Sequence, residues 1–279
     1  MASSLIQETL RNRRQIEKGR PFPEQQAFID DRSQFLAAIC TRRAGKTNAL
    51  ALRFIRTMNE YPRSMSRYIA LTRDSAKDIM WPVLQEMNDR FHLGAVFTEF
   101  NLTMTLPNGS KLKLFGADLK NFIRRLKGAK SPAVAIDEAQ DFGEHITTLI
   151  DDVLTPTLAD YPNSWLALTG TPGPIPRGLF YDITEQGSAH YSIHKWSLYQ
   201  NPYLPNAQDF VDKLKQRKSW DDKNPTYLRE YKGVWVLDLE SLLVRYNANI
   251  NDYTSLPILH WNFILGVDIG FKDADALAV

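Results

Sequence analysis

Cysteine and long apolar runs are almost missing from this sequence. Its 279 residues contain one cysteine, Cys40, which excludes an intramolecular disulfide and a zinc site made of several cysteines. A single thiol agrees with a reducing, cytosolic compartment. No stretch reaches the roughly 18 apolar residues that a membrane-spanning helix needs, and residues 1–20 lack the apolar centre of a signal peptide. We therefore expect a soluble protein with no membrane partner.

Strong charge of one sign is missing as well. Lysine and arginine together number 34 and aspartate and glutamate 32, so the formal net charge is only +2. A contact with nucleic acid would need local basic clusters, because such binding depends on phosphate neutralisation at the contact itself. The hydrophobic share of 43% is that of an ordinary globular protein. The length is sufficient for one large domain with appendages.

Short apolar runs alternate with helical segments along most of the chain. The predicted strands are 35–40, 68–71, 133–136, 165–168 and 191–196. The predicted helices are 24–30, 46–59 and 75–91, the last with Asp74 as its N-cap. A strand pair over 97–115 is expected to turn at Pro107-Asn108-Gly109. This alternation predicts an α/β fold with a mainly parallel sheet and helices on both faces.

The pattern divides the chain into four parts. They are an N-terminal helical arm (1–20), a core domain (21–200), a lid or linker subdomain (201–258) and the start of another domain (259–279). Pro21 and Pro23 end the arm, because proline interrupts a helix. We predict helices at 208–218 and 226–233 in the third part and a strand at 263–268 in the fourth.

The strongest local motif is Cys-Thr-Arg-Arg-Ala-Gly-Lys-Thr at residues 40–47, between a predicted strand and a predicted helix. This context is typical of a Walker A phosphate loop, whose backbone N–H groups and helix N-terminus cradle phosphates. Lys46 would reach the β- and γ-phosphates and Thr47 would bind Mg²⁺. Cys40 stands where the motif has its first glycine. The alternative to a phosphate loop is an ordinary basic turn before a helix. The nucleotide-binding candidates are Thr41, Arg42, Arg43, Ala44, Gly45, Lys46 and Thr47.

Two adjacent acids, Asp137 and Glu138, follow the apolar strand 133–136. Ligand sites in open α/β sheets lie at the carboxyl ends of strands. As in a Walker B motif, Asp137 would hold Mg²⁺ and Glu138 would deprotonate the attacking water. The alternative is that both acids cap the next helix. A base beside a phosphate loop favours ATP hydrolysis over transfer of phosphate to a small molecule.

Two further elements fit a nucleotide site. Residues 169–171 follow the next apolar strand, and their hydroxyls would sense the γ-phosphate if that strand adjoins the Asp137 strand. A simple turn is the alternative there. Gln25, preferred over Gln26, would contact the adenine edge with its amide, unless both glutamines are solvated. The candidate coupling residues are Thr169, Gly170 and Thr171.

Basic residues that could stabilise the transition state lie in two places. Arg42 or Arg43 would act from within the loop, and Arg124, Arg125 or Lys127 from a neighbouring subunit. A guanidinium at the γ-phosphate raises hydrolysis by roughly three to five orders of magnitude. The second cluster is equally suited to a solvated surface or to DNA phosphates, so this choice stays open.

Taken in order, these motifs resemble the large terminase family of tailed phages. The loop resembles the family's variant Walker A, with arginines before Ala-Gly-Lys-Thr. The other matching elements are Gln25, Lys127-Gly128, Ile136-Asp137-Glu138, Thr169-Gly170-Thr171-Pro172, Asn201-Pro202, Tyr227–Trp235 and Phe263–Gly270. The last of them is similar to the first strand of an RNase H-like nuclease, with Asp268 as its first metal-binding acid. The ordered set, rather than any single motif, carries the resemblance.

The resemblance implies a RecA-like P-loop ATPase with an additional strand and a catalytic glutamate. It implies ATP and Mg²⁺ as cofactors and double-stranded DNA as the cargo. It also implies a ring of subunits, five in number, on the portal protein of a procapsid in the host cytoplasm, with a small terminase subunit as partner. Lys127 departs from the family, where many relatives carry arginine. Because only one nuclease acid, Asp268, is visible, we expect ATP hydrolysis without DNA cleavage from this piece of a longer protein.

Two other functions remain open at this point. A helicase of superfamily 1 or 2 shares these motifs, but it would need a second RecA-like lobe that residues 200–279 are too short to form. The second function is that of a nucleotide-binding switch that does not hydrolyse ATP. If DNA is bound, phosphate contacts would hold it without sequence preference. The candidates for that contact are Lys111, Lys113, Arg124 and Arg125.

Overall fold

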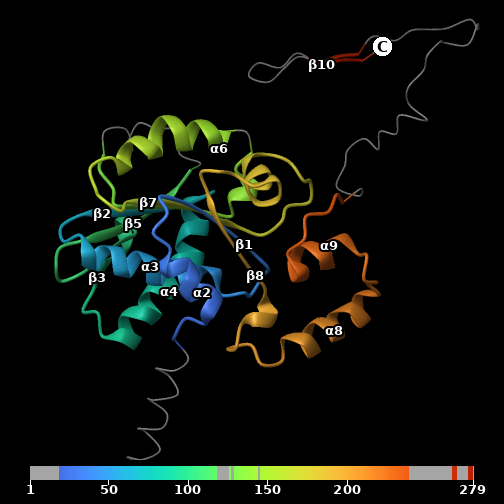
Figure 1. The fold of residues 1–279 in the computed structure, drawn as a ribbon, viewed down its shortest axis with the longest axis horizontal. Helices are drawn as coiled ribbons and strands as arrows, with labels where there is room; N and C mark the ends of the chain where they lie inside the picture. The colour runs from blue at the N-terminus through green and yellow to red at the C-terminus, as the bar shows by residue number, and fades with distance from the viewer. Residues whose placement is uncertain are drawn as a thin grey trace, which may run out of the picture. The chain divides into compact units, whose positions relative to one another are not determined.

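The computed structural model in Figure 1 describes residues 19–117, 126, 129–143 and 145–238, and the backbone of 266–268 and 276–278. The chain splits into two compact units, Met1–Ser241 and Leu242–Val279. In the second unit, β9 (Gly266–Asp268) pairs antiparallel with β10 (Ala276–Ala278). The predicted helical arm, apart from its last two residues, lies outside the described residues, as does the first half of the predicted strand 263–268. In the part that is described, no helix is long and apolar enough to cross a bilayer.

An eight-stranded sheet forms the centre of the first unit. Its strand order is β3-β4-β5-β2-β6-β7-β1-β8. The strands are β1 (Phe35–Cys40), β2 (Met65–Ala70), β3 (Val96–Thr98), β4 (Thr103–Thr105), β5 (Lys111–Gly116), β6 (Ala133–Asp137), β7 (Trp165–Gly170) and β8 (Ser192–Trp196). Neighbouring strands are parallel along the part of the sheet with the order β5-β2-β6-β7-β1-β8. At one edge, β3 pairs antiparallel with β4, and β4 pairs antiparallel with β5. The prediction of a mainly parallel α/β sheet is confirmed.

Side chains of the buried strands point alternately into two cores. In β1, Leu36 and Ala38 belong to one core, and Ala37 and Ile39 to the other. The helices over the first core are α2 (Pro23–Asp30), α3 (Lys46–Glu60) and α4 (Arg73–Phe91). Over the second core lie α6 (His145–Thr148), η3 (Leu149–Leu154) and η4 (Thr155–Leu158). Figure 1 shows α6 across the sheet from α2, α3 and α4, so helices cover both faces as predicted.

Three local predictions need correction. The strand predicted at 68–71 begins earlier, at Met65, because Ser66 and Arg67 are buried polar residues that hide its start in the sequence. The guanidinium of Arg67 donates to the Lys130 carbonyl at 3.0 Å. The N-cap of α4 is Thr72, whose hydroxyl accepts from the Ser75 N–H at 3.0 Å, and not Asp74. The helical stretch over 145–158 was not predicted.

A helical segment follows β8, and we call residues 198–238 the C-terminal helical segment. Its elements are η6 (Leu198–Gln200), α8 (Ala207–Lys218), α9 (Pro225–Tyr227) and η7 (Leu228–Lys232). A small core of its own contains Leu198, Ala207, Val211 and Tyr227. Shorter turns elsewhere are η1 (Glu99–Asn101), η2 (Ala139–Asp141), α7 (Leu179–Tyr181) and η5 (Asp182–Gln186). The segment reaches the loop after β1, where the Arg42 N–H donates to the Glu230 carbonyl at 3.0 Å.

Candidate active site

The sheet order brings three loops together at one edge. β7 lies between β1 and β6, so the turns that follow these parallel strands are neighbours. Asp137 pairs in register with Thr169, and Ile39 with Gly170. The strand of the coupling candidates therefore adjoins the Asp137 strand, which is the arrangement that the coupling hypothesis required.

The loop after β1 has the backbone shape of an anion cradle. Gly45 has φ +81°, where a side chain would be strained, and its position permits the abrupt entry into α3. No side chain caps the first turn of α3, so helix N–H groups are directed at this loop. The Gln25 amide nitrogen donates to the Gly45 carbonyl at 2.7 Å, and the Trp196 indole donates to the Ala44 carbonyl at 2.9 Å. Side chains from outside thus hold the loop by its carbonyls.

Cys40 occupies the position of the missing first glycine without entering the site. Its side chain is 1% exposed and belongs to the apolar core under α2 and α3. Burial raises the pKa of its thiol well above the usual range. A small core residue at the end of β1 is therefore compatible with the loop.

Asp137 is a fully buried carboxylate with several partners. The Tyr68 hydroxyl donates to its Oδ2 at 2.7 Å, and the Thr169 hydroxyl donates to its Oδ1 at 2.6 Å. The Lys46 Nζ lies 3.6 Å from Oδ1. Burial, followed by the nearby Asp137 charge, raises the pKa of Tyr68 well above its usual value, so its hydroxyl remains a donor. Sequence reasoning missed Tyr68, although a buried tyrosine usually needs a partner for its hydroxyl.

Glu138 faces the phosphate loop across the site. Its backbone is left-handed, with φ +53°, and the residue makes no side-chain cap to the following turn. The Lys46 Nζ donates to its Oε1 at 2.7 Å, and the Gln140 amide donates to its Oε2 at 2.8 Å. Burial alone would lower the pKa of Lys46, but the charges of Asp137 and Glu138 raise it above the ordinary value. Lys46 is therefore a charged ammonium held between two acids.

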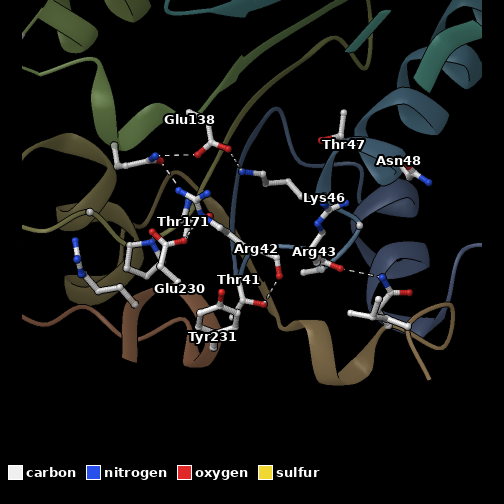
Figure 2. A pocket seen from close by; sticks show the side chains of 18 of the residues that line it. Thr41, Arg42, Arg43, Lys46, Thr47, Asn48, Glu138, Thr171, Glu230 and Tyr231 are labelled. Carbon is white, nitrogen blue, oxygen red and sulfur yellow. Dashed lines mark hydrogen bonds and ion pairs between the residues drawn. The ribbon is translucent and has the colours of Figure 1, made fainter. Parts of the chain in front are cut away.

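These groups line a cavity of about 890 Å³. Its lining includes the whole loop from Thr41 to Thr47, together with Glu138, Thr171 and Glu230. Figure 2 shows Lys46 and Glu138 directed at each other and joined by their hydrogen bond. A smaller cavity of about 230 Å³ shares Gly45, Asn48 and Asn201 with the first and is also lined by Gln25 and Tyr203. The buried Gln25 is thus at the junction of the loop and the smaller cavity.

The two threonines of the coupling candidates differ in position. Thr171 lines the large cavity, whereas Thr169 is fully buried and gives its hydroxyl to Asp137. In this arrangement the Thr169 hydroxyl contacts Asp137 and is not placed to sense phosphate directly. Gly170, between them, lies against Gln140, where an added Cβ would come within 2.3 Å of the amide oxygen.

The C-terminal helical segment contacts the side chain of Arg42 and the backbone of Arg43. The Arg42 guanidinium forms an ion pair with Glu230, and its side chain is 70% exposed. The Arg43 carbonyl accepts from the Asn201 amide at 2.9 Å. Figure 2 shows Arg42 on the side of the cavity where Glu230 lies, and Arg43 nearer to Lys46 and Thr47. Sequence reasoning did not single out Glu230 as a partner, since 188 residues separate it from Arg42.

Several of the predicted functional residues are not placed at this cavity by the described structure. Arg124, Arg125 and Lys127 lie outside the described residues, as does the side chain of Asp268. Lys111 and Lys113 are on β5, which is separated from β6 by β2, and neither lines the large cavity.

Comparison with known proteins gives structural matches only. No model of a known protein family matches the chain, and no curated protein matches its sequence. The large terminase ATPase domain of Thermus phage P74-26 matches with a TM-score of 0.61 and 17% identity, over 78% of this chain and 94% of that one. The large terminase of a thermophilic bacteriophage matches with a TM-score of 0.64 and 14% identity, over 92% and 64%. The large terminase of bacteriophage HK97 matches with a TM-score of 0.58 and 17% identity, over 77% of this chain and 50% of that one.

These matches establish the fold. The chain has the α/β fold of phage large terminase ATPase domains, and it spans about 64% and 50% of the length of the two longer proteins. The terminase of the thermophilic bacteriophage has also been solved in complex with ADP and with ATP-gamma-S.

Proposed function

We propose that this chain is the ATPase part of a phage large terminase, which hydrolyses ATP to drive double-stranded DNA into a procapsid. The observation that carries the proposal is the contact of Lys46 with Glu138, because it places a phosphate-binding cation and a candidate base side by side in the lining of one cavity. The terminase fold supports the same assignment.

The residues present fit a nucleoside triphosphate. The left-handed Gly45 and the uncapped start of α3 suit the phosphates, and Lys46 supplies the positive charge. The smaller cavity suits the adenine, with the oxygen of the Gln25 amide accepting from the adenine amino group. The complexes of a terminase of this fold with ADP and ATP-gamma-S support nucleotide binding.

The donor set also fits Mg²⁺. The Thr47 hydroxyl and the buried Asp137 carboxylate are oxygen ligands of the kind that this ion prefers. The ion, when bound, neutralises charge that develops on the β- and γ-phosphate oxygens. Tyr68 and Thr169 fix the orientation of Asp137 before any ion arrives.

The chemistry of the chain itself starts with an exchange of partners. Lys46 leaves Glu138 for the phosphate oxygens, and the Glu138 carboxylate then accepts a proton from the attacking water. Arg42 must leave Glu230 to act in cis on the γ-phosphate, and this would move the C-terminal helical segment. Arg124, Arg125 or Lys127 of a neighbouring subunit would supply the charge if the finger acts in trans.

The wider setting is part of the same proposal. The chain would work in a ring of five subunits docked on the portal protein of a procapsid, in the host cytoplasm, together with a small terminase subunit. DNA would be held by its phosphates, with Lys111 and Lys113 as candidates. A nuclease that includes Asp268 would need the longer protein.

Steady-state ATP turnover per subunit, measured over a wide range of protein concentration, tests the proposal. We expect Glu138→Gln to lower turnover by about a hundredfold or more, because it removes the base, while leaving nucleotide binding intact. Glu99→Gln, on the surface, is the matched control. Turnover that rises with concentration supports a finger in trans, and turnover independent of concentration favours Arg42 or Arg43. If the wild type is no faster than Glu138→Gln at any concentration, the chain is not an ATPase and a non-hydrolysing switch is the better hypothesis.

A further inference from the structure

Gln140 connects two loops of the site that the proposed mechanism treats separately. It lies in η2, the turn directly after the β6 acids, and its side chain is half-buried. Its amide nitrogen donates to the Glu138 Oε2 at 2.8 Å, and its amide oxygen accepts from the Thr171 N–H at 3.2 Å. One side chain thus joins the candidate base to the loop after β7.

The two oxygens of the Glu138 carboxylate have different partners. Lys46 holds Oε1 at 2.7 Å, and Gln140 holds Oε2 at 2.8 Å. Phosphate oxygens would compete for the Lys46 ammonium, because it is the cation of the phosphate loop. They would not compete for the Gln140 amide. When Lys46 turns to the nucleotide, the contact with Gln140 can still keep the carboxylate in place.

A neutral amide meets both requirements at this position. The carboxylate needs a donor and the Thr171 N–H needs an acceptor, and a glutamine offers both at the end of one flexible chain. A charged glutamate would repel Glu138, and an apolar side chain would leave both groups without this contact. The adjacent Asp141 carboxylate also accepts from the same amide nitrogen, at 3.1 Å, which fixes the orientation of the amide further.

The loop after β7 is shaped around this side chain. A Cβ added to Gly170 would come within 2.3 Å of the Gln140 amide oxygen and within 2.8 Å of the Phe180 ring. A side chain at 170 would therefore displace the Gln140 amide from its present position. The Thr169 hydroxyl also donates to Asp137, at 2.6 Å. This bond joins the ends of β7 and β6, directly before the two loops that Gln140 connects.

We propose that Gln140 is a positioning residue that orients the Glu138 carboxylate for proton abstraction and links its position to the Thr169–Thr171 loop. The proposal rests on the proposed ATPase function for its first half. A shift of the carboxylate would then displace the Thr171 backbone, so that the state of the base is transmitted to the loop. Thr171 borders the cavity, and Pro174 of the same loop contacts the C-terminal helical segment through the Asp238 N–H at 3.0 Å.

The test uses Gln140→Met, which keeps the length of the side chain but removes its hydrogen bonds to Glu138, Thr171 and Asp141. We expect single-turnover ATP hydrolysis to fall by about a hundredfold, since a small displacement of a catalytic group costs about that much. The dissociation constant for ADP should change by less than about twofold, because Gln140 does not belong to the phosphate loop. The control is Gln216→Met, an exposed glutamine on α8, which should match the wild type in both measurements.

A second readout needs no turnover. Hydrogen exchange followed by mass spectrometry, on the chain without nucleotide, should show faster exchange over residues 169–173 in Gln140→Met, by about tenfold at the Thr171 amide. Unchanged exchange there, or hydrolysis within about threefold of the wild type, would overturn the proposal. If wild type and Glu138→Gln hydrolyse equally slowly, the ATPase assignment fails, and the exchange result alone still decides whether Gln140 holds this loop.

The variant Gln140→Glu separates positioning from a general packing role. Its carboxylic acid, when protonated, offers one donor and one acceptor and so restores the pattern of the amide. We expect the hydrolysis rate of Gln140→Glu, divided by that of Gln140→Met at the same pH, to rise as pH falls from about 8 to about 5.5. A ratio that stays flat would contradict orientation by hydrogen bonding. If Gln140→Met does not fold, the rate of Gln140→Glu is divided by that of the wild type instead, and the same rise with falling pH is expected.

Discussion

The two sides of the phosphate loop are built in opposite ways. On the sheet side, the side chains of Lys46 and Asp137 are 9% and 1% exposed, and Tyr68 and Thr169 complete the contacts of the acid. On the side of the C-terminal helical segment, the Arg42 side chain is 70% exposed. Within the described residues, Glu230 is the acid with which it forms an ion pair. One side is a buried network and the other is a surface contact.

The difference indicates which part of the site is fixed and which part can exchange. Removing one member of a buried ion pair leaves an uncompensated charge and is strongly destabilising. An exposed pair contributes little, because water screens it and its side chains lose entropy on pairing. The buried contacts of Asp137 are therefore costly to remove, whereas Arg42 can change partners at small cost.

The largest expected effect follows from Lys46→Met. The variant leaves Asp137 and Glu138 without their cation, so the free energy of unfolding should fall by about 3 to 5 kcal/mol. Urea denaturation followed by circular dichroism measures this change. Lys213→Met, which removes an exposed pair with Asp209, is the control and should cost less than about 0.5 kcal/mol. Equal losses in the two variants would mean that the sheet side is no more cohesive than the surface.

The pH dependence of the same variant sharpens the comparison. Burial lowers the pKa of Lys46, but Asp137 and Glu138 raise it further, so the folded pKa lies above the ordinary value. The charge of Lys46 therefore contributes stability that is complete below about pH 10.4, the unfolded value, and is lost as pH rises past it. The difference in unfolding free energy between wild type and Lys46→Met should stay constant from about pH 7 to 9 and narrow above about pH 10.4. A difference that widens with pH would contradict this account.

The sequence predicted the elements on both sides of the phosphate loop, since the helices expected at 208–218 and 226–233 are found at 207–218 and 225–232. The strand 35–40 has the predicted bounds, and 133–136 and 165–168 differ only at their ends, because fully apolar runs of this length have few other structures open to them. The motifs at the ends of these strands were found because each motif is local. Tyr68 was missed because its hydroxyl meets Asp137 only once β2 and β6 pair.

Contacts between distant segments account for the other misses. Nothing near Glu230 indicates that its partner is Arg42, and nothing near Gln140 indicates that its oxygen will meet the Thr171 N–H. Such pairs depend on strand order and on the path of the C-terminal helical segment, which a single sequence does not encode in any local pattern. The roles predicted for Arg124, Arg125 and Asp268 stay predictions.

A smaller effect is expected from Tyr68→Phe. The variant removes one of the hydrogen bonds to Asp137 and leaves its packing unchanged, so the free energy of unfolding should fall by about 1.5 to 3 kcal/mol, as for bonds to a charged group. Urea denaturation is again the measurement. Tyr203→Phe, on the exposed rim, is the matched control and should cost about 1 kcal/mol or less. If Tyr68→Phe costs no more than its control, the Asp137 network does not depend on that hydroxyl.

The smallest effect on stability, and the sharpest contrast in function, is expected from Arg42→Met. Because the Arg42 side chain is mostly exposed, its loss should change the free energy of unfolding by less than about 1 kcal/mol. A double-mutant cycle with Glu230→Gln measures the pair itself, and its coupling energy should lie in the same range. If Arg42 acts in cis, turnover should nevertheless fall by at least about a hundredfold, while Glu230→Gln keeps it. A coupling energy of several kcal/mol would show instead that the Arg42–Glu230 contact is as firmly built as the sheet side. The C-terminal helical segment would then be a fixed wall of the cavity, and Arg42 could not leave it to reach the phosphate.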